Sequence, residues 1–224
     1  MWTGQQNLVL PYTPNLLRNW SDTVNMANYE HLFEEYEKLA AKADRAFDEV
    51  QKEHEPCVKC EVGCSDCCHA VFGLFPIESM YLNHHFGALK DDIKEQALKQ
   101  GKTADSELQE MQKQLEQCGD DHAKMNQVMA QTRVRCPLLT DEHKCLIYDR
   151  RPVTCRAYGI PTSVGGQARA CWKAGFESGK TYPVFNLDGV YRELHRLSGE
   201  ALKLSGEADP EKAGLLVSVS QAIK

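Results

Sequence analysis

Ten cysteines in a chain of 224 residues constrain the fold more than any other feature of the sequence. They form a dense string within residues 57–68, a second group after residue 135, and one isolated Cys118 between them. The string is Cys57, Cys60, Cys64, Cys67 and Cys68, and the second group is Cys136, Cys145, Cys155 and Cys171. An even count permits disulfides in an exported chain, whereas Cys-x-x-Cys spacings in a reducing compartment favour metal or redox chemistry. We expect a cysteine-thiolate metal centre.

The overall composition is that of an ordinary globular protein. Hydrophobic residues make up 42% and charged residues 26%, so the chain can bury a core that does not depend on metal. A formal net charge of −6 argues against broad nucleic-acid binding. No stretch approaches the roughly 20 apolar residues that span a bilayer, and the first residues do not resemble a signal peptide. These features predict a cytoplasmic protein that binds neither nucleic acid nor a membrane.

The N-terminal part divides into an arm and a scaffold helix. Residues 1–24 contain prolines among scattered apolar residues, and we expect an extended arm. Residues 25–56 carry apolar residues at three- and four-residue steps, which predicts a long helix with one buried face. A second helix is predicted to begin at Pro76, because proline is favoured in a first turn, with Glu78 near the positive end of the helix dipole.

Residues 57–175 form the predicted cysteine-cluster metal-binding region, with a helical insert at about 88–132 between its two halves. The insert is rich in Lys, Glu, Gln and Asp over a thin apolar stripe, which predicts two exposed helices. We expect interruptions at Gly101 and at the Gly-Asp-Asp sequence of residues 119–121. Because the insert separates the two cysteine groups, they must meet in space to form a common centre.

Two further patterns complete the predicted fold. Residues 136–160 place short apolar runs around a polar turn, which predicts a small β-hairpin followed by a helical turn from Pro152. Residues 176–224 are expected to form C-terminal helices over about 187–205 and 210–223. The predicted fold class is mainly α: a helical frame around a small, irregular, cysteine-rich metal-binding core with a short β-hairpin, in one compact domain.

The first cysteine string cannot form a centre alone as a regular helix. Its steps suit one helix face, yet a rise of about 1.5 Å per residue would separate Cys57 from Cys68 by roughly 16 Å. Metal–sulfur bonds are only about 2.3 Å long. Gly63 and the Ser65-Asp66 pair favour a turn that lets the sulfurs converge. The neighbouring Cys67 and Cys68 are then expected to point in different directions, either serving two centres or leaving one sulfur packed as a small apolar group.

Eight sulfurs are available when the last four members of the string join the second group. They are Cys60, Cys64, Cys67, Cys68, Cys136, Cys145, Cys155 and Cys171, which suffice for two four-sulfur sites. All-thiolate coordination selects zinc or an iron–sulfur cluster, such as 4Fe–4S, over the oxygen-preferring calcium and magnesium. The spacing decides neither the metal nor the number of centres. His69 could replace a thiolate, or hydrogen-bond to a sulfur or to the backbone.

Six arginines stand in the second half of the region. They are Arg133, Arg135, Arg150, Arg151, Arg156 and Arg169. A four-thiolate zinc or oxidised 4Fe–4S centre is formally dianionic, and an arginine in contact gains up to roughly 4 kcal/mol of gross attraction at intermediate dielectric. The arginines therefore compensate this charge or orient an anion. The other interpretation places them on a solvated face, paired with Asp149 and Glu142.

The cysteines occur in a specific order of short motifs. These are Cys-x(3)-Cys-x-x-Cys-Cys from Cys60, Cys136-Pro-Leu-Leu, Cys145-Leu-Ile-Tyr-Asp, Arg151-Pro and Cys155-Arg-Ala-Tyr. In this order the sequence resembles the bacterial YkgJ-type cysteine-cluster family of zinc- or iron-chelating proteins, over about residues 57–171. The resemblance implies metal or iron–sulfur binding. Relatives include a flagellin lysine methylase that uses S-adenosylmethionine, which does not imply that this chain methylates anything.

The resemblance also implies a ligand set. By position, the eight cysteines named above are the implied ligands, whereas Cys57 and Cys118 have no counterpart. Members with shorter first strings have two residues where this chain has three between Cys60 and Cys64, so Cys60 is the least well matched of the eight.

Three functions follow from these observations. The first is an iron–sulfur protein that acts in redox chemistry or in a modification reaction. The second is a structural zinc module whose outer helices bind another protein. The third is a metal carrier or sensor, for which exposed cysteines such as Cys57 or Cys118 would be suited. No catalytic residue is assigned, because the sequence contains no recognisable hydrolase arrangement, phosphate loop or dinucleotide fingerprint.

Overall fold

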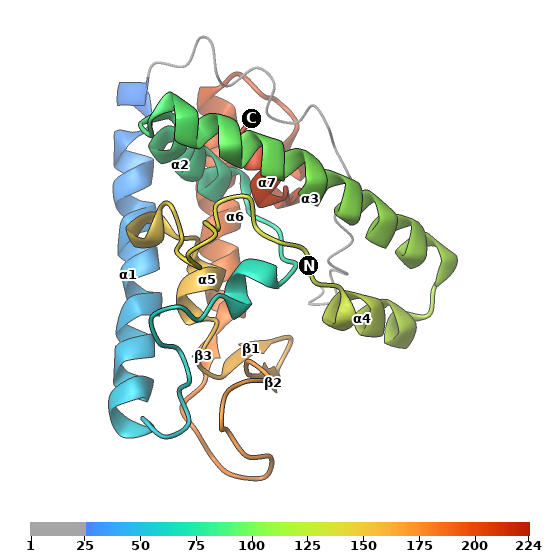
Figure 1. Ribbon diagram of the computed structural model, residues 1–224. Helices are drawn as coiled ribbons and strands as arrows, with labels where there is room; N and C mark the ends of the chain where they lie inside the picture. Colours follow the sequence, from blue (N-terminus) through green and yellow to red (C-terminus); the bar gives the residue numbers. More distant parts are fainter. Residues whose placement is uncertain (1–25) are drawn as a thin grey trace.

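The computed structural model describes residues 26–224, so the predicted arm over residues 1–24 lies outside the described residues. After a short 3-10 helix, Met26–Asn28, the long helix α1 covers Glu30–Glu53 and confirms the predicted scaffold helix. Its buried side chains repeat at the expected three- and four-residue steps: Leu32, Tyr36, Leu39, Ala40, Ala43 and Val50. The opposite face of α1 is charged and faces solvent, so the helix forms one wall of the molecule (Figure 1).

Helix α1 packs against three other helices to form the main core. These are α2 (Pro76–Gly87), α5 (Val153–Ala157) and α6 (Leu187–Leu204). The start at Pro76 and the helical turn after Pro152 are both as predicted. The hydroxyl of Ser198 on α6 accepts a hydrogen bond from the Ile77 backbone N–H at 3.2 Å, which satisfies one of the unpaired donors at the start of α2. The core therefore supports the cysteine region from one side.

The insert forms the two predicted helices, α3 (Asp91–Gln117) and α4 (His122–Gln131). Asp121 caps α4, accepting a hydrogen bond from the Lys124 backbone N–H at 3.1 Å, so the break before α4 is as predicted. The break expected at Gly101 is wrong, because α3 continues through it. Gly101 faces the C-terminal helix α7 (Val219–Ala222), where Ser220 lies close to its Cα. Figure 1 shows the outer half of α3 and all of α4 extending away from the rest of the molecule.

A small sheet follows α5. Strands β1 (Thr162–Val164) and β2 (Gln167–Arg169) pair antiparallel, and β3 (Phe185–Asn186) pairs parallel to β1, giving the order β2-β1-β3. Gly165 and Gly166 connect β1 to β2 with positive φ angles of 59° and 73°, which glycine adopts without strain. This sheet was not among the predicted elements.

Two other predictions change in detail. The hairpin expected within residues 136–160 is reduced to a single antiparallel bridge between Leu139 and Cys145. The helix expected over 210–223 is wrong for its middle part, where Val217 pairs with Leu74 through two backbone hydrogen bonds. Helical turns remain on either side, at Pro210–Gly214 and in α7. None of the helices between residues 26 and 224 is both long and apolar enough to cross a membrane.

Candidate metal centre

The first cysteine string is a series of turns rather than a helix. Helix α1 ends at Glu53, and the Cys64 N–H donates to the Glu61 carbonyl at 2.9 Å across a turn in which Gly63 has a φ of +91°. A short 3-10 helix, Asp66–His69, then carries the Cys67-Cys68 doublet. The turn predicted at Gly63 is confirmed, and its positive φ favours glycine.

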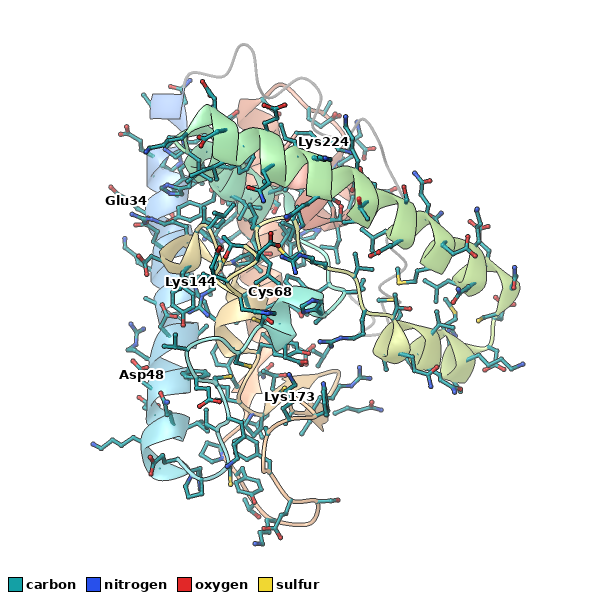
Figure 2. All side chains as sticks on the ribbon, in the orientation of Figure 1. Glu34, Asp48, Cys68, Lys144, Lys173 and Lys224 are labelled. Atoms are coloured by element: carbon teal, nitrogen blue, oxygen red, sulfur yellow. The ribbon has the colours of Figure 1, made fainter. Side chains whose placement is uncertain are left out.

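Backbone hydrogen bonds bring the second cysteine group to the doublet. The Cys136 N–H donates to the Cys68 carbonyl at 2.7 Å, and the Val134 N–H donates to the His69 carbonyl at 3.1 Å. The chain between residues 69 and 134, which comprises α2 and the insert, therefore begins and ends at the same place, and the two cysteine groups meet as expected. Figure 2 shows Cys68 near the middle of the molecule in this view, with Asp48 of α1 on one side.

Helix α5 carries Cys155, and the buried Glu78 holds the start of that helix. One Glu78 carboxylate oxygen accepts the Val153 N–H of α5 at 3.1 Å, and the other accepts the Phe75 N–H at 3.2 Å. Burial raises the Glu78 pKa to about 7, although these N–H donors and Tyr36 oppose the rise. The sequence predicted Glu78 at the α2 N-terminus but not its second role at α5.

Two cavities bring the predicted ligands together. The larger has a volume of about 1020 Å³ and is lined by Cys60, Cys64, Cys67, Cys68, Cys145, Cys155 and Cys171. The smaller, about 60 Å³, is lined by Cys67, Cys68, Cys136, Cys145 and Cys155. All eight predicted ligands thus border one cavity or both, whereas Cys57 and Cys118 border neither. The structure brings the eight together and leaves those two apart.

The two thiols of the Cys67-Cys68 doublet differ in pKa. The two sulfurs are 3.9 Å apart, so the expectation that they point in different directions is wrong. A hydrogen bond from the Cys68 thiol lowers the Cys67 pKa to about 7, and the nearby Arg151 acts in the same direction. The same hydrogen bond, together with burial, raises the Cys68 pKa. Without metal, Cys67 is the thiol of the pair that ionises first.

Most of the other thiols are held neutral by burial. Burial raises the pKa of Cys60 to about 11 and that of Cys136 to about 12. It also raises the pKa of Cys145, Cys155 and Cys171. Only the thiolate form binds metal, so loading this centre must release protons.

The donor set fits a thiophilic metal. Soft sulfur ligands without oxygen donors select zinc or iron–sulfur clusters. Within residues 26–224, however, no three His, Cys, Asp or Glu side chains are close enough together to hold a single ion as they stand. The sulfurs surround a shared space instead of one point.

The arginines have different partners from those expected. Four form ion pairs with carboxylates elsewhere: Arg133 with Asp66, Arg135 with Asp141, Arg150 with Glu37, and Arg156 with Asp44. Asp149 and Glu142 form none of these pairs. Within the described part of the chain, Arg151 has no carboxylate partner. It stacks on the Tyr148 ring at 3.6 Å, donates from Nε to the Tyr148 carbonyl, and lines both cavities.

Asp66 is a site residue that sequence reasoning assigned only to a turn. Its side chain is 4% exposed and accepts hydrogen bonds from Arg133 at 2.7 Å, Tyr158 at 3.0 Å and Trp172 at 3.2 Å. The Cys171 sulfur lies 3.5 Å from the same carboxylate. Burial raises the Asp66 pKa, but the Tyr158 hydrogen bond and the Arg133 charge outweigh it and lower the pKa overall. Asp66 therefore joins the doublet to the segment that carries Cys171.

Three other candidates lie apart from the cavities. His69 Nδ1 is 3.0 Å from the Ser65 carbonyl, which agrees with the backbone hydrogen bond considered for it. The Cys118 sulfur donates to the Gln114 carbonyl at 3.3 Å at the end of α3. The Cys57 carbonyl accepts the Gly175 N–H at 2.8 Å, so this residue contributes through its backbone.

Comparison with known proteins gives one match. A family model described as "Putative zinc- or iron-chelating domain", CxxCxxCC, matches residues 56–172, just over half of the chain. No curated protein and no solved structure matches. The matched range begins just before the first cysteine string and ends just after Cys171, so it contains every residue that lines the two cavities with sulfur.

Proposed function

Because this chain belongs to the CxxCxxCC family and carries its metal-chelating domain, we propose that it is an iron–sulfur protein acting in redox chemistry or in a modification reaction. The proposed ligands are Cys60, Cys64, Cys67, Cys68, Cys136, Cys145, Cys155 and Cys171. The family description covers zinc and iron alike, so the choice of an iron–sulfur cluster rests on the geometry around the sulfurs.

The observation that carries this choice is the open cavity beside the sulfurs. Structural zinc sites are closed and four-coordinate, and no ligand-sized space is needed next to them. Here seven of the proposed ligands line a cavity of about 1020 Å³. Small-molecule sites typically measure about 300 to 1000 Å³. A centre that meets a substrate or an electron carrier at this cavity accounts for the space better than a purely structural ion.

The spacing of the thiols also supports a cluster. A single ion holds all its ligands within one bond length, whereas a cluster of several irons binds each cysteine at a different iron and keeps the sulfurs further apart. The thiols of residues 26–224 share a space without converging on one point. This arrangement needs less rearrangement around a cluster than around one zinc ion.

The surrounding residues would set the properties of the bound cluster. A cluster supplies one-electron chemistry when bound. Arg151 would offset its negative charge, because this guanidinium lines both cavities and has no carboxylate partner among residues 26–224. Apolar side chains of the smaller cavity, such as Phe72, Leu138 and Ile147, would exclude water from one side.

Zinc is the second candidate, and the doublet favours it. In a tetrahedral site with bonds of about 2.3 Å, two sulfurs lie about 3.8 Å apart. The Cys67 and Cys68 sulfurs, at 3.9 Å, already have that separation. A structural zinc at the doublet would join the first cysteine string to the second group, and the outer helices would be free to bind a protein partner.

Anaerobic purification from iron-replete cells separates the two candidates. The proposal predicts broad visible absorption together with iron and acid-labile sulfide. A colourless protein with stoichiometric zinc under these conditions would contradict it. Cys155→Ser should lower bound metal, whereas the matched variant Cys118→Ser should not, since Cys118 lines neither cavity. Equal metal content in both variants would refute the ligand assignment.

A further inference from the structure

We propose that the eight cysteines form two separate four-sulfur centres, which adjoin at the Cys67-Cys68 doublet. This inference rests on the metal-binding function proposed above. The inner centre would use Cys68, Cys136, Cys145 and Cys155. The outer centre would use Cys60, Cys64, Cys67 and Cys171.

The inner set comprises four of the five cysteines that line the smaller cavity, and the fifth is Cys67. Cys136 lines only this cavity. The backbone fixes three of the four members relative to one another: Cys136 N–H bonds to the Cys68 carbonyl at 2.7 Å, and Cys145 forms a bridge with Leu139, whose N–H bonds to the Cys136 carbonyl at 3.1 Å. Cys155 enters from α5, whose first turn is held by Glu78. These contacts form one rigid unit around the small cavity.

The outer set is defined by the larger cavity. Cys60, Cys64 and Cys171 line this cavity and not the smaller one. The Cys136 N–H bonds to the Cys68 carbonyl, which places Cys68 with the inner set, whereas Cys67 directly follows Asp66, whose carboxylate contacts the Cys171 sulfur. These contacts assign Cys67, rather than Cys68, as the fourth outer ligand.

Two contacts hold the outer set together across the sequence. The Gly175 N–H donates to the Cys57 carbonyl at 2.8 Å, which places the turn after Cys171 against the first cysteine string. Asp66 lies 3.5 Å from the Cys171 sulfur and precedes Cys67 directly. Cys171 is therefore held next to the first cysteine string by contacts that do not involve the inner set.

The two centres would differ in the polarity of their surroundings. The inner one is bordered mainly by apolar side chains around a cavity of about 60 Å³. The outer one faces the cavity of about 1020 Å³, which is also lined by charged side chains such as Asp44 and Arg156. A charged chelator would therefore take metal from the outer centre faster than from the inner one.

The test is metal content per chain in matched variants of the full chain, purified without oxygen. Cys171→Ser removes an outer ligand, Cys136→Ser removes an inner ligand, and Cys118→Ser is the control. We expect each ligand variant to keep about half of the wild-type iron and sulfide, while the control keeps all of it. Circular dichroism checks that each variant is folded.

A second measurement needs no substitution. Iron release from the wild-type protein to a chelator should occur in two phases of similar amplitude, and Cys171→Ser should lack the faster phase. A single phase, or complete loss of iron in both ligand variants although they are folded, would refute the two-centre proposal and leave the proposed function intact. Wild-type protein without iron would refute the proposed function itself, and the release experiment could then be repeated with its zinc.

Discussion

Replacing Asp66 with alanine should destabilise the protein far more than replacing an exposed carboxylate in a similar ion pair. The Asp66 side chain is 4% exposed and accepts hydrogen bonds from Arg133, Tyr158 and Trp172. Lys173 lies 3.6 Å from the same carboxylate. Removing one partner of a buried ion pair costs about 3 to 5 kcal/mol, because the remaining charge stays desolvated.

The partners of Asp66 are partly exposed, which limits this cost. The Arg133 side chain is 36% exposed and that of Lys173 is 44% exposed, so water can hydrate both charges after the substitution. We therefore expect the lower end of the range, about 3 kcal/mol. Asp66→Asn keeps the shape but turns an amide group toward a set of donors, so its cost should be nearly as large.

Equilibrium unfolding in urea, with a reductant and without metal, measures this difference. The control is Asp141→Ala, because Asp141 pairs with Arg135 but its side chain is 79% exposed. Surface ion pairs contribute about 0 to 1 kcal/mol. If the free energies of unfolding of Asp66→Ala and Asp141→Ala agree within about 1 kcal/mol, the inference that Asp66 joins the doublet to the Cys171 segment is wrong.

Three further predictions concern positions outside the sulfurs. Between pH 4.5 and about 7, Glu78 keeps a proton in the folded chain and releases it in the unfolded chain. The free energy of unfolding should therefore fall by about 3 kcal/mol as the pH rises through this window. Urea titrations at several pH values should show that Glu78→Gln removes this dependence. Gly101→Ala should raise the unfolding free energy by about 0.5 to 1 kcal/mol, because the added Cβ would lie 3.6 Å from the Ser220 Cβ, and a lower melting temperature would contradict this. Gly159→Ala should instead cost about 1 to 3 kcal/mol, because its Cβ would overlap the Cys60 sulfur, and unchanged thermal unfolding would show that Cys60 moves freely.

The helical frame could be predicted because its signal is local. The buried face of α1 follows from apolar residues three and four positions apart, and the start of α2 follows from Pro76. Gly101 was assigned to a break because glycine disfavours helix, but α3 packs against α7 at this point and stays helical. That reason comes from a segment more than a hundred residues away in the chain.

Elements that depend on distant pairing were not predictable. Val217 is extended because it pairs with Leu74, a residue that is distant in sequence. Strand β3 has two residues and pairs with β1 across a long loop, so neither alternation nor length could reveal it. Such short strands are stabilised by their pairing partners, and the residues within a strand do not show which distant segment pairs with it.

The candidate site also has a part that could be predicted from the sequence and a part that could not. The chemistry of eight thiols was evident from residue type and order, and the cavities place those thiols together. Asp66 was assigned only to a turn because aspartate is common in turns. Its donors come from Arg133, Tyr158 and Trp172, which are distant in sequence. A buried carboxylate is recognised from its partners, and the sequence alone does not reveal which residues those partners are.

The hydrogen bonds at the base of the insert explain how two distant cysteine groups become one region. His69 and Val134 are joined at 3.1 Å, and Cys68 and Cys136 at 2.7 Å, so the chain between them begins and ends at the same point. The position of Cys136 beside the doublet is therefore fixed by these bonds, while α4 and the part of α3 after Leu108 line neither cavity. Closing a loop costs only about 0.6 kcal/mol for each doubling of its length. The insert can therefore become longer or shorter with little loss of stability and without moving the sulfurs. The residues that must be kept are the few whose hydrogen bonds close this segment.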